Sequence, residues 1–277
     1  MTTALSVMRP AIAKKLKGYI SGTTTSAGAT DGTTFICSSL SEYSDGFLKN
    51  RWALIGGVKR KIDTNFQSNG TVRVLIPFTV GGAAPFTSGV ATATAFEIYS
   101  IDPDDIKTEI NAAIKGVFPI LCKIVSDETT LETAADTYAY AVPTTITGDP
   151  LQIWLEPPTS TDPWIRLLDW NYDVVNVKIR FPYDLPDEYA LRLIGITYLT
   201  AVTTDVSTTE LDEPQIQLIY AMVVAEIYRM LQAGEIGTDG NKYANYVSKW
   251  ENEAERLKVE QRMVLPDRTL KMSGWTL

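Results

Sequence analysis

Histidine is absent from this chain of 277 residues. The imidazole ring is the usual general base near neutral pH, the partner of serine and cysteine nucleophiles, and a frequent zinc ligand. Its absence excludes each of those sites. The sequence also lacks a phosphate-binding GxxxxGK[ST] loop. We therefore predict that the protein is not an enzyme, with no catalytic residue, no metal and no cofactor.

Cysteine is scarce as well. Cys37 and Cys122 are the only two, which is too few for a four-cysteine zinc site or a disulfide framework. A free cysteine behaves as a small hydrophobic residue. We expect two reduced, buried thiols in a protein that is made in the cytoplasm.

Long apolar runs are missing too. The longest, Leu218–Tyr228, contains Glu226, whereas a transmembrane helix needs roughly 20 apolar residues. The basic N-terminal segment is followed by no apolar signal segment. We expect no association with a membrane.

Positive charge is limited. The chain has 25 Lys and Arg against 33 Asp and Glu, a formal net charge of −8. A protein that grips nucleic acid needs clustered basic residues that displace counterions. An acidic surface would instead let double-stranded DNA pass without sequence-specific binding.

A β-rich segment follows an N-terminal helical arm over residues 1–17. Residues 18–100 are rich in Thr, Ser and Gly with short apolar runs, which indicates a small β-barrel or β-sandwich module. The candidate strands are Tyr19–Thr25, Thr33–Cys37, Trp52–Ile55, Val58–Asn65, Thr71–Phe78 and Phe96–Tyr99. Asn69-Gly70 predicts a type I′ hairpin turn.

Two start signals predict helices. Asp102-Pro103 suits the N-cap and first turn of a helix over 102–118, because an N-cap carboxylate accepts backbone N–H groups and proline fits the first helical position. Asp212 similarly begins a helical hairpin over 212–262. After it, residues 266–277 have no periodicity, and we expect an extended tail.

The stretch between these helices predicts strands. Residues 131–200 contain short apolar runs separated by prolines. The candidates are Tyr138–Val142, Leu151–Leu155, Trp164–Trp170, Val174–Phe181 and Ala190–Tyr198. The predicted fold class is thus α+β: the β module, followed by a helical-hairpin core domain over 101–265 that carries an inserted antiparallel β-sheet.

Carboxylates are the remaining candidates for catalysis, as in glycoside hydrolysis, or for Ca²⁺. The clusters are Asp102/Asp104/Asp105, Asp184/Asp187/Glu188 and Glu210/Asp212/Glu213. The first and third stand at helix starts and the second stands among prolines, so we predict capping and turn roles. Trp154, Trp164 and Trp170 lie in predicted strands, where they favour core or interface packing over sugar stacking.

The order of parts resembles the head-to-tail adaptor, or connector, proteins of tailed bacteriophages. One likeness is the helix 102–118, with its Asn-Ala-Ala stretch at Asn111. A second is Tyr138–Pro143, followed by strands that include Trp164–Trp170. A third is Leu191–Tyr198, a Thr/Asp-rich loop, and Leu211-Asp212-Glu213-Pro214 opening a long helix. Residues 18–99 look like a small β module found at the start of some such proteins.

The resemblance implies a virion structural protein of the neck region. It would form a homo-oligomeric ring, usually of about twelve subunits, beneath the portal protein and lining the DNA path, and would bind the next neck or tail protein. The expected interface residues are Tyr220, Tyr228, Tyr246, Trp250, Leu270, Trp275 and Leu277, and we expect the three tyrosines to be exposed for side-to-side packing.

Two alternatives stay open. The second hypothesis is another neck, tail-completion or fibre-attachment protein of a phage. The neighbouring genes would distinguish such a protein from an adaptor. A third hypothesis is a glycan-binding or glycan-hydrolysing module that acts through carboxylates and tryptophans.

Overall fold

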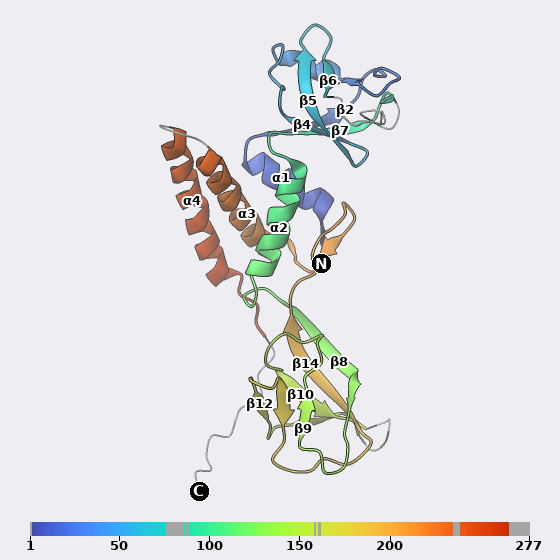
Figure 1. Ribbon diagram of the computed structural model, residues 1–277, viewed down its shortest axis with the longest axis vertical. Coiled ribbons are helices and arrows are strands. Elements are labelled where there is room, and N and C mark those ends of the chain that lie inside the picture. The colour runs from blue at the N-terminus through green and yellow to red at the C-terminus, as the bar shows by residue number, and fades with distance from the viewer. Residues whose placement is uncertain are drawn as a thin grey trace. The chain divides into compact units, whose positions relative to one another are not determined.

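The computed structural model is mixed α+β, and its described residues form four α-helices and several antiparallel sheets (Figure 1). It describes residues 2–75, 86, 89–157, 159, 162–234 and 239–265. The chain divides into two compact units, Met1–Ala113 with Ala201–Leu257, and Ile114–Thr200 with Lys258–Leu277. These boundaries differ from the predicted domains, because the helical hairpin groups with the N-terminal β module.

The first unit contains a six-stranded sheet in the order β2-β7-β4-β5-β6-β3. Its strands are β2 (Tyr19–Thr23), β3 (Thr34–Ile36), β4 (Trp52–Ile55), β5 (Val58–Phe66), β6 (Thr71–Val74) and β7 (Ala95–Tyr99), and a 3₁₀ helix spans Ser38–Glu42. The fully buried side chains Phe35, Ile62 and Ile98 belong to its core. A single bridge between Ser26 and Ile36 joins the edges. The described strands do not close into a barrel, so that alternative is wrong.

The turns of this sheet differ from the prediction. Gly56 and Gly57, between β4 and β5, have φ of +57° and +78°, the positive pair that a type I′ turn requires. Around Asn69-Gly70 the ladder resumes at Phe66 and Thr71, so the loop has four residues, and only Gly70 has positive φ, at +66°. The predicted hairpin is confirmed, but its type I′ turn is wrong.

The helices of the first unit follow the predicted signals. They are α1 (Leu5–Lys15), α2 (Pro103–Gly116), α3 (Glu213–Gly234) and α4 (Asp239–Glu260). Two short strands, β1 (Thr3–Ala4) and β15 (Thr208–Thr209), pair antiparallel. Helix α3 is buried along most of its length, whereas α4 buries Val247, Ala254 and Leu257, part of the apolar seam that the sequence shows at steps of three and four.

The second unit consists of two antiparallel sheets, in the orders β11-β10-β14-β8 and β12-β13-β9. Their strands are β8 (Lys123–Glu132), β9 (Ala139–Ala141), β10 (Gln152–Leu155), β11 (Ile165–Leu167), β12 (Asn171–Asp173), β13 (Lys178–Arg180) and β14 (Ala190–Thr197). Strand β8 begins eight residues before the predicted β region. The predicted strand Val174–Phe181 is wrong in its first half, since its first four residues form the loop of the β12–β13 hairpin.

Two expectations from composition concern the whole chain. Cys37 and Cys122 are free and buried, one in each unit, as predicted. Within the described ranges, none of the helices combines the length and apolar character needed to cross a membrane.

Gly70 offers a test of the β module. An added Cβ there would lie 2.0 Å from the Cys37 carbonyl oxygen, whereas one at Gly57 meets nothing within 4 Å. Both positions have positive φ, so alanine is strained at each. Gly70→Ala should lower the free energy of unfolding by about 3 kcal/mol and Gly57→Ala by about 1 kcal/mol, as measured by urea unfolding. Equal losses would contradict the close approach.

Candidate interaction surfaces

The first acidic cluster caps helix α2. The Asp104 backbone N–H donates to Asp102 Oδ1 at 2.9 Å, and the Ile106 N–H donates to the Asp102 carbonyl oxygen at 3.2 Å. Asp102 is therefore the N-cap, as predicted. Its carboxylate also accepts Lys59 Nζ at 2.6 and 2.8 Å.

The other two clusters also have structural partners. The Gln215 backbone N–H points at Asp212 Oδ1 at 3.4 Å, which places Asp212 at the start of α3. Asp187 Oδ1 accepts the Ala135 N–H at 3.0 Å within the second unit. The described residues contain no group of three or more acidic or cysteine side chains arranged to hold a metal ion. The predicted capping role is thus confirmed at Asp102 and Asp212, whereas Asp187 binds the backbone of a residue far away in the chain.

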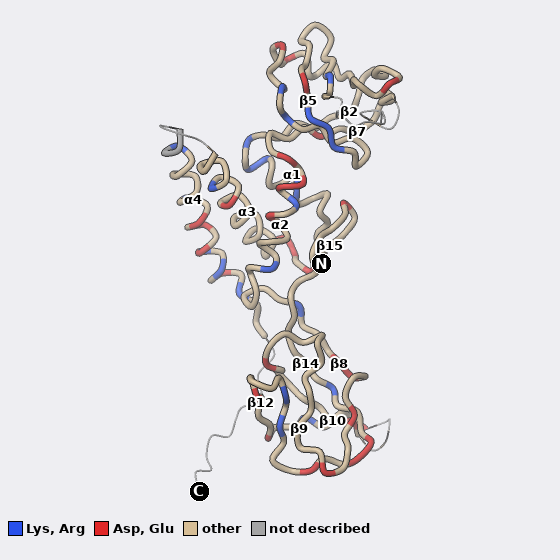
Figure 2. The backbone as a smooth tube through the Cα atoms, viewed as in Figure 1, with Lys and Arg blue, Asp and Glu red and all other residues tan. Residues whose placement is uncertain are grey.

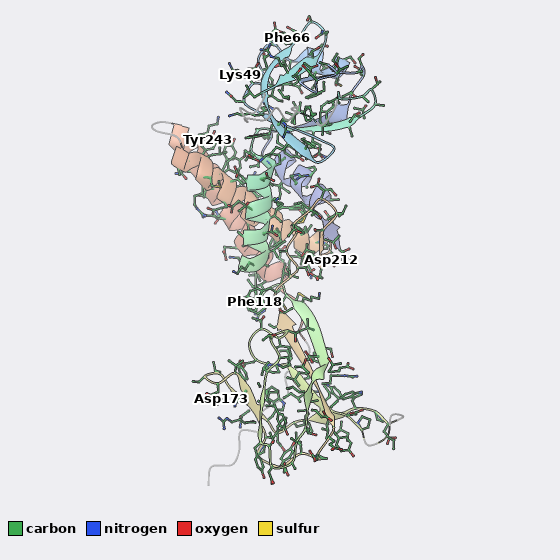
Figure 3. All side chains as sticks on the ribbon, turned by 45° about the vertical axis from the view of Figure 1, so that its right-hand side comes forward. Lys49, Phe66, Phe118, Asp173, Asp212 and Tyr243 are labelled. Atoms are coloured by element: carbon green, nitrogen blue, oxygen red, sulfur yellow. The ribbon has the colours of Figure 1, made fainter. Side chains whose placement is uncertain are left out.

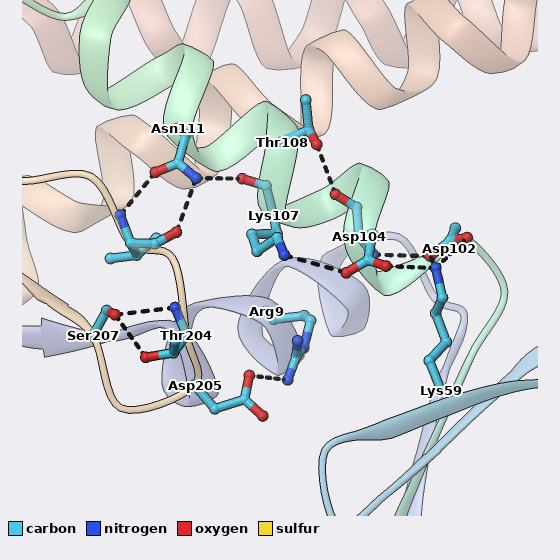
Figure 4. Close-up of polar contacts among 11 residues, drawn as sticks. Arg9, Lys59, Asp102, Asp104, Lys107, Thr108, Asn111, Thr204, Asp205 and Ser207 are labelled. Carbon is cyan, nitrogen blue, oxygen red and sulfur yellow. Dashed lines mark hydrogen bonds and ion pairs between the residues drawn. The ribbon is translucent and has the colours of Figure 1, made fainter.

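A set of ion pairs connects the β module to the helices of the first unit (Figure 4). Lys59 on β5 contacts Asp104 at 2.6 Å, and Asp104 also pairs with Lys107 at 3.4 Å. The hydrogen bond and charge of Lys59 lower the pKa of Asp104. We call Lys59, Asp102, Asp104 and Lys107 the β5–α2 clasp, and every cation in it has a carboxylate partner.

The loop before α3 is fixed by two further polar contacts. Arg9 on α1 is buried and donates to Asp205 at 2.8 Å and to the Tyr99 hydroxyl at 3.4 Å. Although burial alone would lower the pKa of Arg9, Tyr99 and Asp205 leave it raised. Asn111 on α2 accepts the Val202 N–H at 2.8 Å and donates to the Val202 carbonyl at 2.9 Å, so its amide satisfies both backbone groups (Figure 4).

The predicted interface tyrosines are largely internal. Tyr220 and Tyr228 are buried, so their expected exposure is wrong, while Tyr246 is half-buried. Lys15 Nζ on α1 lies 5.9 Å from the Tyr220 ring centroid and 5.3 Å from that of Trp250, close enough for cation–π attraction. These aromatic residues hold α1 against the hairpin. Their role between subunits stays a prediction.

Tyr228 and Tyr246 nevertheless line a cavity, together with residues that the sequence did not point to. The Tyr228 and Tyr246 rings stack at 4.9 Å, and Tyr243, labelled in Figure 3, lies 6.1 Å from Tyr228. The adjoining cavity has a volume of about 340 Å³, and its lining contains no Asp or Glu within the described ranges of the chain. Its cations and tyrosines are Lys17, Arg51, Lys242, Tyr228, Tyr243 and Tyr246, which we call the cationic tyrosine pocket.

Arg51 is the central cation of this pocket. Its guanidinium lies 4.8 Å from the centroid of the Phe47 ring, and burial lowers the pKa of Arg51. Among the described residues, the structure records no carboxylate partner for Arg51, Lys17 or Lys242. An unpaired cation that loses water is unfavourable unless an anion approaches.

The predicted tryptophan strip divides between two environments in the second unit. Trp170 is buried in the core. Trp154 and Trp164 are half-buried, and Arg192 lies 4.1 Å above the Trp164 ring centroid while Arg166 lies 6.0 Å from that of Trp154. A guanidinium group therefore lies over one face of each of these two rings, where a sugar could otherwise stack.

The β12–β13 hairpin presents an apolar tip. Val174, Val175 and Val177 are 70%, 89% and 49% exposed. Asp173, labelled in Figure 3, accepts the N–H groups of Val175 and Asn176 at 3.2 and 3.1 Å. We call this loop, residues 174–177, the valine tip.

Asp173 also makes the valine tip rigid through its side-chain partners. Its Oδ2 accepts the Asn176 amide at 2.8 Å and the Arg180 guanidinium at 2.8 Å. The Asn176 and Arg180 hydrogen bonds lower the pKa of Asp173 to about 2, so it stays ionised in any near-neutral buffer. Val177 has φ of +52°, a strained conformation for a β-branched residue. Strain of this kind is concentrated at functional sites.

Three of the predicted interface residues, Leu270, Trp275 and Leu277, lie outside the described residues. Comparison of the sequence with models of known protein families and with curated proteins finds no match.

The β5–α2 clasp leads to a prediction about stability. Lys59→Met removes the cation shared by Asp102 and Asp104, and should lower the free energy of unfolding at pH 7 by about 1 kcal/mol, because both ends are partly exposed. The folded-state pKa of Asp104 is lowered, so this stabilisation is present above the unfolded carboxylate pKa of about 3.9 and is lost as the pH falls below it.

The control is Lys61→Met, since Lys61 also lies over Trp52 but has no recorded carboxylate partner in the described part of the chain. Chemical unfolding at pH 7 and pH 3 measures both variants. A Lys59→Met penalty that is unchanged at pH 3, or equal to that of Lys61→Met, would contradict the clasp.

Proposed function

We propose that the protein is a virion structural protein, a head-to-tail adaptor that forms a homo-oligomeric ring below the portal of a tailed phage. The observation that carries the proposal is the valine tip. It displays three exposed valines on a loop whose backbone is held by Asp173. Exposed apolar surface on a rigid support is typical of a protein–protein contact.

The order of elements supports the same function. Helix α2 is followed along the chain by the antiparallel strands β8 to β14 and then by the long helices α3 and α4. This is the arrangement that the resemblance to connector proteins implies, with a β region inserted between an early helix and a helical hairpin. The β module over residues 18–100 precedes it.

The carboxylates support a contact role over glycan hydrolysis. Asp102, Asp212 and Asp187 are committed to backbone N–H groups. A retaining or inverting glycosidase instead needs two carboxylates that face one substrate across a gap of about 5 to 10 Å. The guanidinium groups over Trp154 and Trp164 also compete with sugar stacking. Another neck or tail-completion role fits the same features, and binding to purified portal distinguishes the adaptor from it.

The valine tip provides the first test. Replacing Val174 and Val175 by serine should leave the urea-unfolding curve within about 0.5 kcal/mol of wild type, because both side chains are exposed. Assembly with portal or with the next tail component should fall at least tenfold, as followed by sedimentation velocity. The matched control is Val206→Ser, at a valine that is 84% exposed in the first unit. Normal assembly of the double variant would contradict a contact role for the tip.

The C-terminal segment provides the second test. Deletion of residues 266–277 should leave the two units folded, as judged by circular dichroism, and should abolish the joining of heads to tails in an in vitro assembly assay. Replacing Leu270, Trp275 and Leu277 by alanine in the full-length chain should reproduce the loss. If the truncated protein joins heads to tails normally, the docking role of the tail is wrong.

A further inference from the structure

The cationic tyrosine pocket has the chemistry of an anion site. Lys17, Arg51 and Lys242 line one cavity, and no Asp or Glu is among its described lining residues, in a chain whose formal net charge is −8. The contrast with the β5–α2 clasp is informative, because each cation there has a carboxylate partner within 3.4 Å. A pocket with unbalanced positive charge in an acidic protein gains from an incoming carboxylate.

The dimensions and donors of the pocket favour a protein segment over nucleic acid. A cavity of about 340 Å³ accommodates a few side chains. Duplex DNA is instead held by rows of basic residues that follow the phosphate backbone. The rings of Tyr228, Tyr243 and Tyr246 add apolar surface with hydroxyl groups, the composition of contact sites for aromatic and acidic side chains.

The second unit presents a segment with complementary chemistry. Residues 114–200 contain twelve acidic and six basic residues, a surplus of acidic over basic side chains, which Figure 2 marks in red and blue. Within it, the loop 182–188 exposes Tyr183, Asp184 and Glu188. We call it the acidic loop. No ion pair is recorded for Asp184 or Glu188 among the described residues.

The acidic loop is already ordered. Asp187 Oδ1 accepts the Ala135 N–H at 3.0 Å, and the Glu188 N–H donates to the Thr133 carbonyl at 3.0 Å. Pro182 and Pro186 restrict its backbone further. A loop with this conformation loses little entropy on binding, so its free carboxylates remain available for a partner.

We propose that the cationic tyrosine pocket of one subunit binds the acidic loop of a second copy of this chain. The proposal rests on the adaptor function, since it names a contact within the ring. The pocket and the loop are different surfaces of the same chain, so each subunit offers one to one neighbour and the other to the next. Such a heterologous contact generates a closed ring when its rotation closes.

The first experiment measures the contact without the ring. A fluorescein-labelled peptide with the sequence of residues 182–188 is titrated into the full-length protein and followed by fluorescence anisotropy. It should bind, Arg51→Glu should weaken it at least tenfold, and higher salt should weaken it further. Lys49→Glu is the control of equal charge change, because Lys49 is exposed and lies outside the pocket lining. Equal effects of the two variants, or no binding of the peptide, would overturn the proposal.

The second experiment tests the contact in the assembly. Arg51→Glu, or Lys242→Glu at the exposed rim, should prevent self-association of the chain, and Asp184→Arg/Glu188→Arg should do the same. Mixing the pocket variant with the loop variant should restore association, since each reversed surface then meets a complementary one. Native mass spectrometry measures the oligomers.

The outcomes separate the two proposals. If the wild-type chain forms rings and the pocket variants form them equally well, the proposed contact is wrong while the adaptor function stands. A further outcome is that phosphate or a DNA duplex displaces the peptide because either binds the pocket more tightly than the peptide does. In that case the pocket is a phosphate site, and the proposed contact with the acidic loop is wrong. If the peptide binds as expected but neither the protein alone nor its mixture with portal assembles, the adaptor function fails by itself.

Discussion

The ion pairs of Lys59 with Asp102 and Asp104 hold together the elements on which the first unit depends. Lys59 comes from the β module, whereas both carboxylates belong to the start of α2. Asp102 also caps that helix. The same side chain therefore pairs with the β module and begins the helix. Arg9 and Asn111 then attach α1 and the loop before α3 to the same region.

Acidic and basic side chains have different surroundings in different parts of the chain. Asp102, Asp104 and Asp212, three of the acidic residues that look like candidates for catalysis, serve as helix caps or ion-pair partners. Cations are paired in the β5–α2 clasp, whereas those of the cationic tyrosine pocket have no recorded carboxylate partner in the part of the chain that the structure describes. Residues 114–200 contain twelve acidic and six basic residues. Under the proposed function, the contrast between this segment and the cationic tyrosine pocket favours contact between copies.

The sequence predicted the helices and most strands because their signals are local. Asp102 and Asp212 mark helix starts through capping, and the alternation of large and small residues over Tyr138–Val142 marks β9. The sequence did not predict strand β8, because β8 is an edge strand that contains Ser, Asp, Glu and Thr, most of which are exposed. The cationic tyrosine pocket was not predicted from the sequence for a different reason. Lys17, Arg51 and Lys242 are far apart in sequence, and only the tertiary fold brings them to one cavity. An Asx pattern at Asp173 and Asn176 was the available signal that the valines form a loop.

Under the proposed function, this chain works through contact with copies of itself and with the portal. Electron micrographs of the purified protein, alone and mixed with purified portal, test that function most directly. We expect closed rings of identical subunits, and complexes in which such a ring is stacked coaxially on the portal. A protein that remains monomeric at micromolar concentration and leaves the portal undecorated would contradict it.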